Sequence, residues 1–287
     1  MTRTNGPFGN RLGFPACFNF NLFPAARELS FVVMNLRFSS FGPWGPLLLM
    51  VCLAGCGSSG SHPESAEAPA PGWHENTLRH DDLAREFRFY VPGDLPDALP
   101  IVVVLHGGTQ SMDEIFESGA GGTQEWRQIA DDEGALLLVP NGTNIDTGAP
   151  SGDKQSWNDC RPEERARPDA DDVGFITALL DWAADRFADT AVTLNTEQTL
   201  VTGASNGGMM TYRLATERPR RVAAAAAFIA NRPAPSECPD ASAPVPMLIV
   251  NGTDDPLMPY EGGPIAPAFG GLGTVASAEA TRDDWVG

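Results

Sequence analysis

Positive charge is scarce in this 287-residue sequence. It has 19 Lys and Arg residues against 37 Asp and Glu residues, which gives a formal net charge of −18 at pH 7. A chain this acidic repels the phosphate backbone, so we expect no nucleic-acid partner. The remaining composition, 42% hydrophobic and 20% charged, is that of an ordinary folded domain.

Long apolar runs, internal repeats and metal-ligand clusters are also missing. No segment reaches the roughly 18 apolar residues that a membrane-spanning helix needs. The four His and five Cys residues show no spacing typical of a metal site. We therefore expect one large domain without a metal or cofactor.

Leu47 to Cys56 form a short apolar run that ends in Leu-Ala-Gly-Cys. This ending resembles the lipobox of bacterial lipoprotein signal peptides, in which the Cys becomes the lipidated first residue of the mature chain. We predict a signal peptide over residues 34–55 and lipidation at Cys56. Residues 1–33 carry no targeting motif, and we interpret them as a mis-assigned upstream extension. The alternative for the apolar run is a buried Leu-rich segment.

Ser, Pro, Ala and Gly dominate the residues that follow Cys56. This composition buries no core and predicts a flexible tether over residues 56–80. An export signal followed by a tether indicates a protein outside the cytoplasm that contacts the membrane only through its lipid anchor.

From residue 81 onward, β-branched runs alternate with segments of helical periodicity. Strands are predicted at 87–91, 101–105, 135–139, 199–202, 222–229 and 247–250, and helices at 124–133, 173–187 and 206–217. Asp172 is the expected N-cap of the second helix. The pattern predicts an α/β fold with a mainly parallel sheet, helices on both faces, and functional residues at the C-terminal ends of the strands.

The strongest chemical signal is Gly203-Ala-Ser205-Asn-Gly207, between a predicted strand and a predicted helix. This is the context that a G-x-S-x-G nucleophile turn requires, because its glycines allow a sharp bend that exposes the Ser hydroxyl. The following helix N-terminus offers backbone N–H groups to a developing oxyanion. Ser205 is therefore the candidate nucleophile, against the alternative of a Gly-rich helix start.

His106-Gly-Gly108 follows the apolar strand at 101–105. A His-Gly-Gly at a strand end resembles the oxyanion loop of α/β-hydrolases, in which glycines let the backbone N–H groups approach the substrate. By this resemblance, the N–H groups of Gly108 and Asn206 are the predicted oxyanion donors. For His106, we favour a role in bracing the loop over a role as catalytic base.

A late acid is expected after the strand at 247–250, in the segment Asn251-Gly-Thr-Asp-Asp255. A triad in the chain order Ser, Asp, His uses such an acid to orient the imidazole. We choose Asp255 over Asp254; a solvated turn acid is the alternative. Cys160 and Cys238 are the cysteines left in the folded part, and their spacing does not decide whether they form a disulfide.

Four segments together carry a family resemblance: residues 203–215, 171–175, 105–110 and 252–260. They are similar to the polyhydroxybutyrate depolymerase and feruloyl esterase group of α/β-hydrolases. The resemblance implies an α/β-hydrolase fold and a secreted serine esterase acting on a polyester or on aromatic or acetyl esters of plant polysaccharides. It also implies that Trp157 lies near the site, lining the substrate or packed in the core, and that Asp171 and Asp172 start a helix.

The sequence departs from this family in its histidines. Asn251 stands where the family usually has His, and no His follows Asp255. We therefore expect the catalytic domain over 81–287 to lack its C-terminal part, including the catalytic His. The favoured function is an exported serine esterase with a Ser-His-Asp mechanism. The alternatives are a non-catalytic, surface-anchored binding lipoprotein and a serine peptidase of the same fold.

Overall fold

A computed structural model describes residues 66–117, 125–162, 168–267 and 271–286. The chain divides into two units, 1–59 and 60–287, and the first lies wholly outside the described residues. The predicted signal peptide, the lipidation site Cys56 and the first part of the tether also lie outside them. None of the described helices has the length and apolar character of a membrane span.

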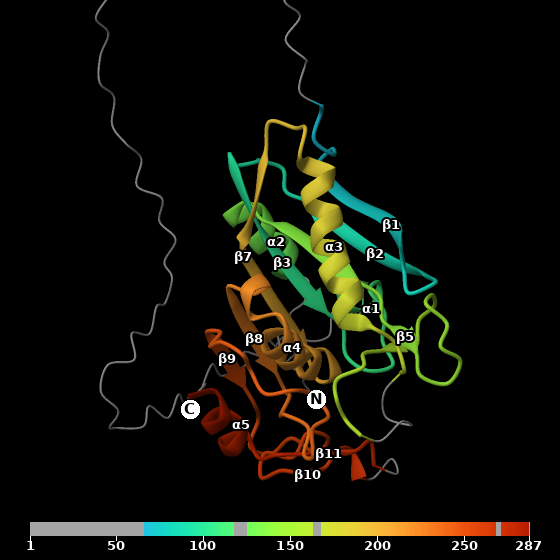
Figure 1. Ribbon diagram of the computed structural model, residues 1–287, viewed down its shortest axis with the longest axis vertical. Helices are drawn as coiled ribbons and strands as arrows, with labels where there is room; N and C mark the ends of the chain where they lie inside the picture. The colour runs from blue at the N-terminus through green and yellow to red at the C-terminus, as the bar shows by residue number, and fades with distance from the viewer. Residues whose placement is uncertain (1–65, 118–124, 163–167, 268–270, 287) are drawn as a thin grey trace, which may run out of the picture. The chain divides into compact units, whose positions relative to one another are not determined.

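A seven-stranded sheet with the order β1-β2-β4-β3-β7-β8-β9 forms the centre of the second unit (Figure 1). Its strands are β1 (Gly72–His80), β2 (Leu83–Val91), β3 (Ala98–Leu105), β4 (Leu136–Pro140), β7 (Thr193–Ala204), β8 (Ala224–Phe228) and β9 (Met247–Val250). From β4 to β9 all neighbours are parallel, whereas β1–β2 and β2–β4 are antiparallel. Short pairs are formed by β5 (Thr143–Asn144) with β6 (Gln155–Ser156) and by β10 (Gly263–Pro264) with β11 (Thr274–Val275).

Helices cover both faces of this sheet. They are α1 (Glu114–Glu117), α2 (Glu125–Glu133), α3 (Asp172–Phe187), α4 (Asn206–Glu217), the 3₁₀ turn η2 (Pro219–Arg221) and α5 (Ala278–Val286). Apolar side chains of α3 and α4 pack with Ile101 and Val103 on one face, whereas α1 and α2 pack with Val102 and Val104 on the other. This alternation along β3 confirms the predicted α/β architecture, since a strand buried on both faces has apolar residues at every position.

Residues 72–80 correct the predicted extent of the tether, because they form β1. Each residue of β1 pairs with a residue of β2, from Gly72 opposite Val91 to His80 opposite Leu83. The Trp73 ring packs against Tyr90 and Phe116. Since β1 is a half-exposed edge strand, its own sequence is polar, and its pairing with β2 stabilises it.

Asp171, and not Asp172, caps α3. The Asp171 carboxylate accepts a hydrogen bond from the Gly174 N–H at 2.9 Å. Asp172 is fully buried, where it forms an ion pair of 2.7 Å with Arg85 and accepts the Asn158 N–H at 2.7 Å. The two adjacent acids therefore have separate tasks: one satisfies the helix N-terminus, and the other connects α3 to β2 and to the segment after β6.

Candidate active site

Ser205 lies in the sharp turn between β7 and α4. Its backbone has φ 55° and ψ −121°, in a region that residues with a side chain rarely adopt. Its N–H donates to the Phe228 carbonyl at 2.9 Å, which fixes the turn against the end of β8. Strained backbone of this kind is concentrated at functional sites.

Glycines on either side of Ser205 permit this turn. A Cβ on Gly203 would lie 2.5 Å from the backbone of Gly207, and a Cβ on Gly207 would lie 2.4 Å from the carbonyl oxygens of Leu105 and His106. Real side chains do not tolerate such distances. The glycines of the G-x-S-x-G motif are thus required for α4 to start directly against the ends of β3 and β7.

Gly108 and Asn206 lie side by side next to this turn. A Cβ on Gly108 would be 3.4 Å from the Cβ of Asn206. Within the described residues, neither the Gly108 N–H nor the Asn206 N–H donates a hydrogen bond. The structure therefore brings together the two predicted oxyanion donors, with Asn206 as the first residue of α4.

His106 braces the loop, as favoured from the sequence. Its side chain is 1% exposed. Nδ1 donates to the Gly107 carbonyl at 2.7 Å, and Nε2 accepts the Gly142 N–H at 3.0 Å. Both ring nitrogens are used, and burial lowers the pKa of His106 to about 4. The ring is therefore neutral and unavailable as a base for Ser205.

Of the two expectations for Trp157, the structure has the core position. It is fully buried, its ring packs against His106, and its Nε1–H donates to the His106 carbonyl at 2.9 Å. In addition, its backbone N–H donates to Oδ1 of Asn206 at 2.7 Å. Trp157 therefore supports His106 and Asn206 from inside the core.

Asp255 lies in the loop after β9, at the same edge of the sheet as Ser205. Asn251, the first residue after β9, connects the end of this strand to the segment after β8, because its side chain accepts the Ala230 N–H at 2.9 Å. Oδ1 of Asp255 accepts the N–H groups of Leu257 and Met258 at 2.8 and 2.9 Å. Oδ2 has no hydrogen-bond partner among the described residues, so one carboxylate oxygen is free for an imidazole. Asp254, the rejected alternative, is exposed.

The other described histidines are too far from Ser205 to act on it. His74 and His80 are on β1, which is four positions from β7 in the sheet order. At the usual strand spacing this separation is about 19 Å. His80 instead contacts Asp171 at 3.0 Å, and His74 contacts the Ala70 carbonyl at 2.7 Å. His62 lies outside the described residues.

Sequence reasoning missed a buried polar cluster beside α4. Asp159 is 1% exposed and Arg161 is 3% exposed, and their side chains form an ion pair of 2.9 Å. The Asn206 side-chain amide donates to Asp159 at 2.6 Å. No local pattern indicated this cluster, because its members come from the segment after β6 and from α4.

Cys160, within the same segment, forms a disulfide with Cys238, and their Cα atoms are 5.3 Å apart. Glu217 lies close enough to these two residues to suggest a three-ligand metal site. The disulfide occupies both sulfur atoms, so this group does not bind a metal in its oxidised state.

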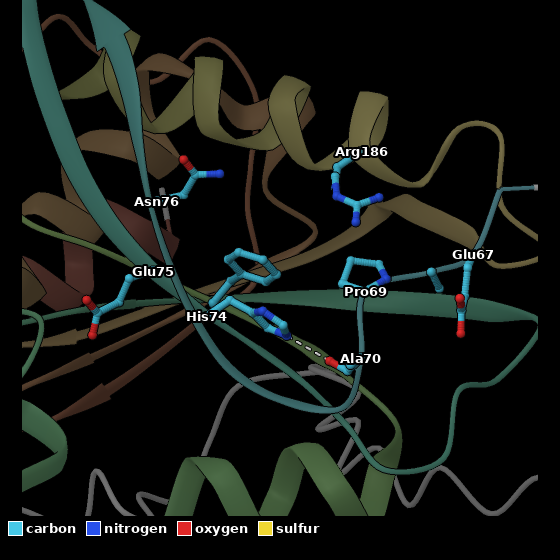
Figure 2. A pocket seen from close by; sticks show the side chains of 9 residues that line it. Glu67, Pro69, Ala70, His74, Glu75, Asn76 and Arg186 are labelled. Carbon is cyan, nitrogen blue, oxygen red and sulfur yellow. Dashed lines mark hydrogen bonds between the residues drawn. The ribbon is translucent and has the colours of Figure 1, made fainter.

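A pocket of about 500 Å³ lies away from Ser205. Figure 2 shows its lining side chains, with Glu67 and Pro69 on the segment before β1, His74 on β1, and Arg186 near the end of α3. Arg186 is at the opposite end of α3 from Asp171, and therefore at the opposite edge of the sheet from the nucleophile turn. The pocket is not part of the candidate active site.

No family model matches the chain. The putative esterase NocK of Nocardia uniformis subsp. tsuyamanensis is 31% identical over 175 residues, which are 61% of this chain and 45% of NocK. The probable feruloyl esterase C of Aspergillus niger is 25% identical over 204 residues, which are 68% of this chain and 66% of that protein.

The poly(3-hydroxybutyrate) depolymerase of Ralstonia pickettii is 30% identical over 131 residues, which are 44% of this chain and 25% of the depolymerase. This chain therefore spans from a quarter to two thirds of the length of these three relatives. A solved complex of a pOPH variant with pNPB has a TM-score of 0.51 at 15% identity and covers 77% of each chain.

The relatives named esterase, feruloyl esterase and polyhydroxybutyrate depolymerase confirm the resemblance that the motifs indicated. The structural comparison and the sheet topology agree on the fold. The chain has the α/β-hydrolase fold and is similar in sequence to proteins named esterase, feruloyl esterase and poly(3-hydroxybutyrate) depolymerase.

Proposed function

We propose that this protein is a serine carboxylic-ester hydrolase with Ser205 as nucleophile. The observation that carries the proposal is the strained Ser205 backbone, φ 55° and ψ −121°, next to two adjacent N–H groups without partners in the described residues. A helix start without a catalytic task gains nothing from such strain. The esterase names of the relatives give the reaction class.

In the proposed reaction, the Ser205 hydroxyl attacks the ester carbonyl carbon. The negative oxygen of the tetrahedral intermediate accepts hydrogen bonds from the N–H groups of Gly108 and Asn206, each worth about 10²–10³ in rate. The intermediate expels the alcohol and leaves an acyl group on Ser205. Water then attacks the acyl-enzyme and releases the carboxylic acid.

Proton transfer in this mechanism requires an imidazole between Ser205 and Asp255. None of the described histidines supplies it, since His106 is buried with both nitrogens used and the other two are on β1. Our proposal is that this base comes from a residue outside the described part of the protein. Asp255, with its free Oδ2, would hold the imidazolium.

The proposed substrates follow from the names of the relatives. These include a probable feruloyl esterase, a bifunctional acetylxylan esterase/xylanase and a poly(3-hydroxybutyrate) depolymerase. Aromatic or acetyl esters of polysaccharides and short hydroxyalkanoate polyesters are thus the classes to test first, with p-nitrophenyl acetate as a general probe.

We propose in addition that the protein is exported and lipidated at Cys56. The Leu-Ala-Gly-Cys pattern supports this, and so does the Cys160–Cys238 disulfide, since disulfides persist in oxidising compartments. Expression from Met34, the first residue of the predicted signal peptide, in a bacterial host, followed by intact-mass measurement, tests it. A cleaved product carrying lipid on Cys56 is expected; an unmodified, uncleaved product would contradict the proposal.

The hydrolase proposal is tested by chemical rescue. None of the described histidines can act on Ser205. If no other residue of the 287-residue chain supplies the base, the chain should hydrolyse p-nitrophenyl acetate slowly, because a Ser hydroxyl without a base is a weak nucleophile. Added imidazole should raise this turnover to a saturating level by occupying the position beside Asp255. Ser205→Ala should abolish the imidazole-dependent turnover, and Ser151→Ala, at an exposed position, should retain it.

The same experiment can reject the proposal. If imidazole accelerates hydrolysis equally with the wild-type chain and with Ser205→Ala, the acceleration comes from free imidazole in solution. That result would favour the non-catalytic binding lipoprotein, the alternative from a different functional class.

A further inference from the structure

The Asn206 side chain is held in one orientation by three hydrogen bonds. Oδ1 accepts the Trp157 N–H at 2.7 Å, and Nδ2 donates to the Trp157 carbonyl at 3.0 Å. Nδ2 also donates to Oδ2 of Asp159 at 2.6 Å. Because Asn206 is 3% exposed, water does not compete for these bonds.

Arg161 holds the Asp159 carboxylate in turn. Its Nε donates to Oδ1 at 2.9 Å, and its Nη2 lies 2.9 Å from Oδ2. Nη1 of Arg161 also donates to the Leu272 carbonyl. The pair is buried and mutually neutralised, so Asp159 can accept from Asn206 without placing an uncompensated negative charge beside a developing oxyanion.

The segment that carries this pair is fixed at both ends. Cys160 lies between Asp159 and Arg161 in the sequence and forms a disulfide with Cys238. In addition, the Glu237 N–H donates to the Cys160 carbonyl at 2.9 Å. On the other side, Ser156 accepts the Thr109 N–H at 3.2 Å, one residue after Gly108. One short segment therefore contacts the backbone next to both oxyanion donors.

We propose that Asp159 is a positioning residue of the oxyanion site. Its carboxylate, oriented by Arg161, holds the Asn206 side chain and so fixes the direction of the Asn206 N–H relative to that of Gly108. This inference rests on the proposed hydrolase function. Asp159 does not touch the substrate; it sets the geometry of a group that does.

The test compares two double variants that both remove the buried ion pair. In Asp159→Asn with Arg161→Met, the Asn oxygen still accepts from Asn206 Nδ2. In Asp159→Leu with Arg161→Met, a side chain of similar size offers no acceptor. Each is assayed as the full 287-residue chain with p-nitrophenyl acetate and saturating imidazole, and folding is compared by thermal unfolding and near-ultraviolet circular dichroism.

The Asn double variant should keep a kcat within about threefold of the wild type. The Leu double variant should lose about 10–100-fold in kcat, with KM nearly unchanged, because a misplaced donor weakens the transition state more than the bound ester. If the Leu double variant does not fold, Asp159→Ala with Arg161→Met gives the same comparison.

Equal kcat values for the Asn and Leu double variants, with an active wild type, would overturn the positioning role and leave the hydrolase function intact. Absence of Ser205-dependent turnover in the wild type itself would overturn the hydrolase function and, with it, this inference.

Discussion

At the scale of single residues, His106 shows how a buried imidazole makes stability depend on pH. In the unfolded chain this side chain binds a proton below about pH 6.5. In the folded protein, burial lowers its pKa to about 4. Between these two values the unfolded state binds more protons, so the free energy of unfolding rises with pH. The contribution of the neutral His106 side chain to the free energy of unfolding is complete above about pH 6.5 and is lost as the pH falls to about 4.

His106→Gln should flatten this dependence, because Gln keeps an acceptor for the Gly142 N–H but does not titrate. Urea unfolding at pH 7 and at pH 4.5 measures the effect. From pH 7 to pH 4.5, the free energy of unfolding of the wild type should fall by about 2–3 kcal/mol more than that of the variant. Equal losses would show that His106 is protonated in the folded protein or is not buried.

The sequence was sufficient to predict those residues of the candidate site whose positions depend on local backbone geometry. Ser205, Asn206 and Gly108 follow strands directly, and short motifs with glycine were sufficient to place them together. Asp159 and Trp157 could not be assigned in this way. Their roles arise from contacts across about 50 positions of the sequence, and such tertiary contacts leave no periodic signal.

At the scale of elements, the close approach of α4 to β3 depends on one glycine. Gly207→Ala would place a methyl group 2.4 Å from two backbone carbonyl oxygens, so α4 must move away from the strand end. We expect a loss of stability of at least about 1–3 kcal/mol, the usual cost of overpacking.

Gly252→Ala is the matched control, since the nearest atom to its new methyl group is 3.9 Å away. That change should alter stability by no more than about 0.5 kcal/mol. Both are measured by chemical denaturation, and similar stabilities for the two variants would contradict the described packing of the turn.

Element prediction succeeded where a strand or helix carries its own pattern. The bounds of α4 and β9 agree with the predicted segments 206–217 and 247–250. It failed for β1, because this polar edge strand forms through its hydrogen-bonded pairing with β2 and its sequence has no alternation of apolar and polar residues. Pairing with β1 also explains why β2 begins at Leu83, four residues before the predicted start at residue 87.

At the scale of the whole molecule, one part of the sheet exposes apolar side chains. Leu200, Leu248 and Val250 are 40%, 55% and 38% exposed. The strand register places all three on the face opposite α4, over β7, β8 and the edge strand β9 (Figure 1). Exposed apolar surface beside an open edge strand favours aggregation.

Leu248→Lys should therefore reduce aggregation on heating, as measured by light scattering, without lowering the unfolding temperature. Leu257→Lys is the control, because Leu257 is 49% exposed but lies in the loop after β9. An equal effect of both substitutions would indicate that added charge, and not this apolar face, controls aggregation.

The central claim is that Ser205 is the nucleophile, and site-resolved labelling tests it most directly. The chain is incubated with a fluorophosphonate and imidazole, digested, and analysed by mass spectrometry. The account predicts a phosphonyl group on Ser205 of the peptide that spans the β7–α4 turn, and no labelling of that peptide in Ser205→Ala. An unlabelled Ser205, or a label on another residue of the wild-type chain, would contradict it.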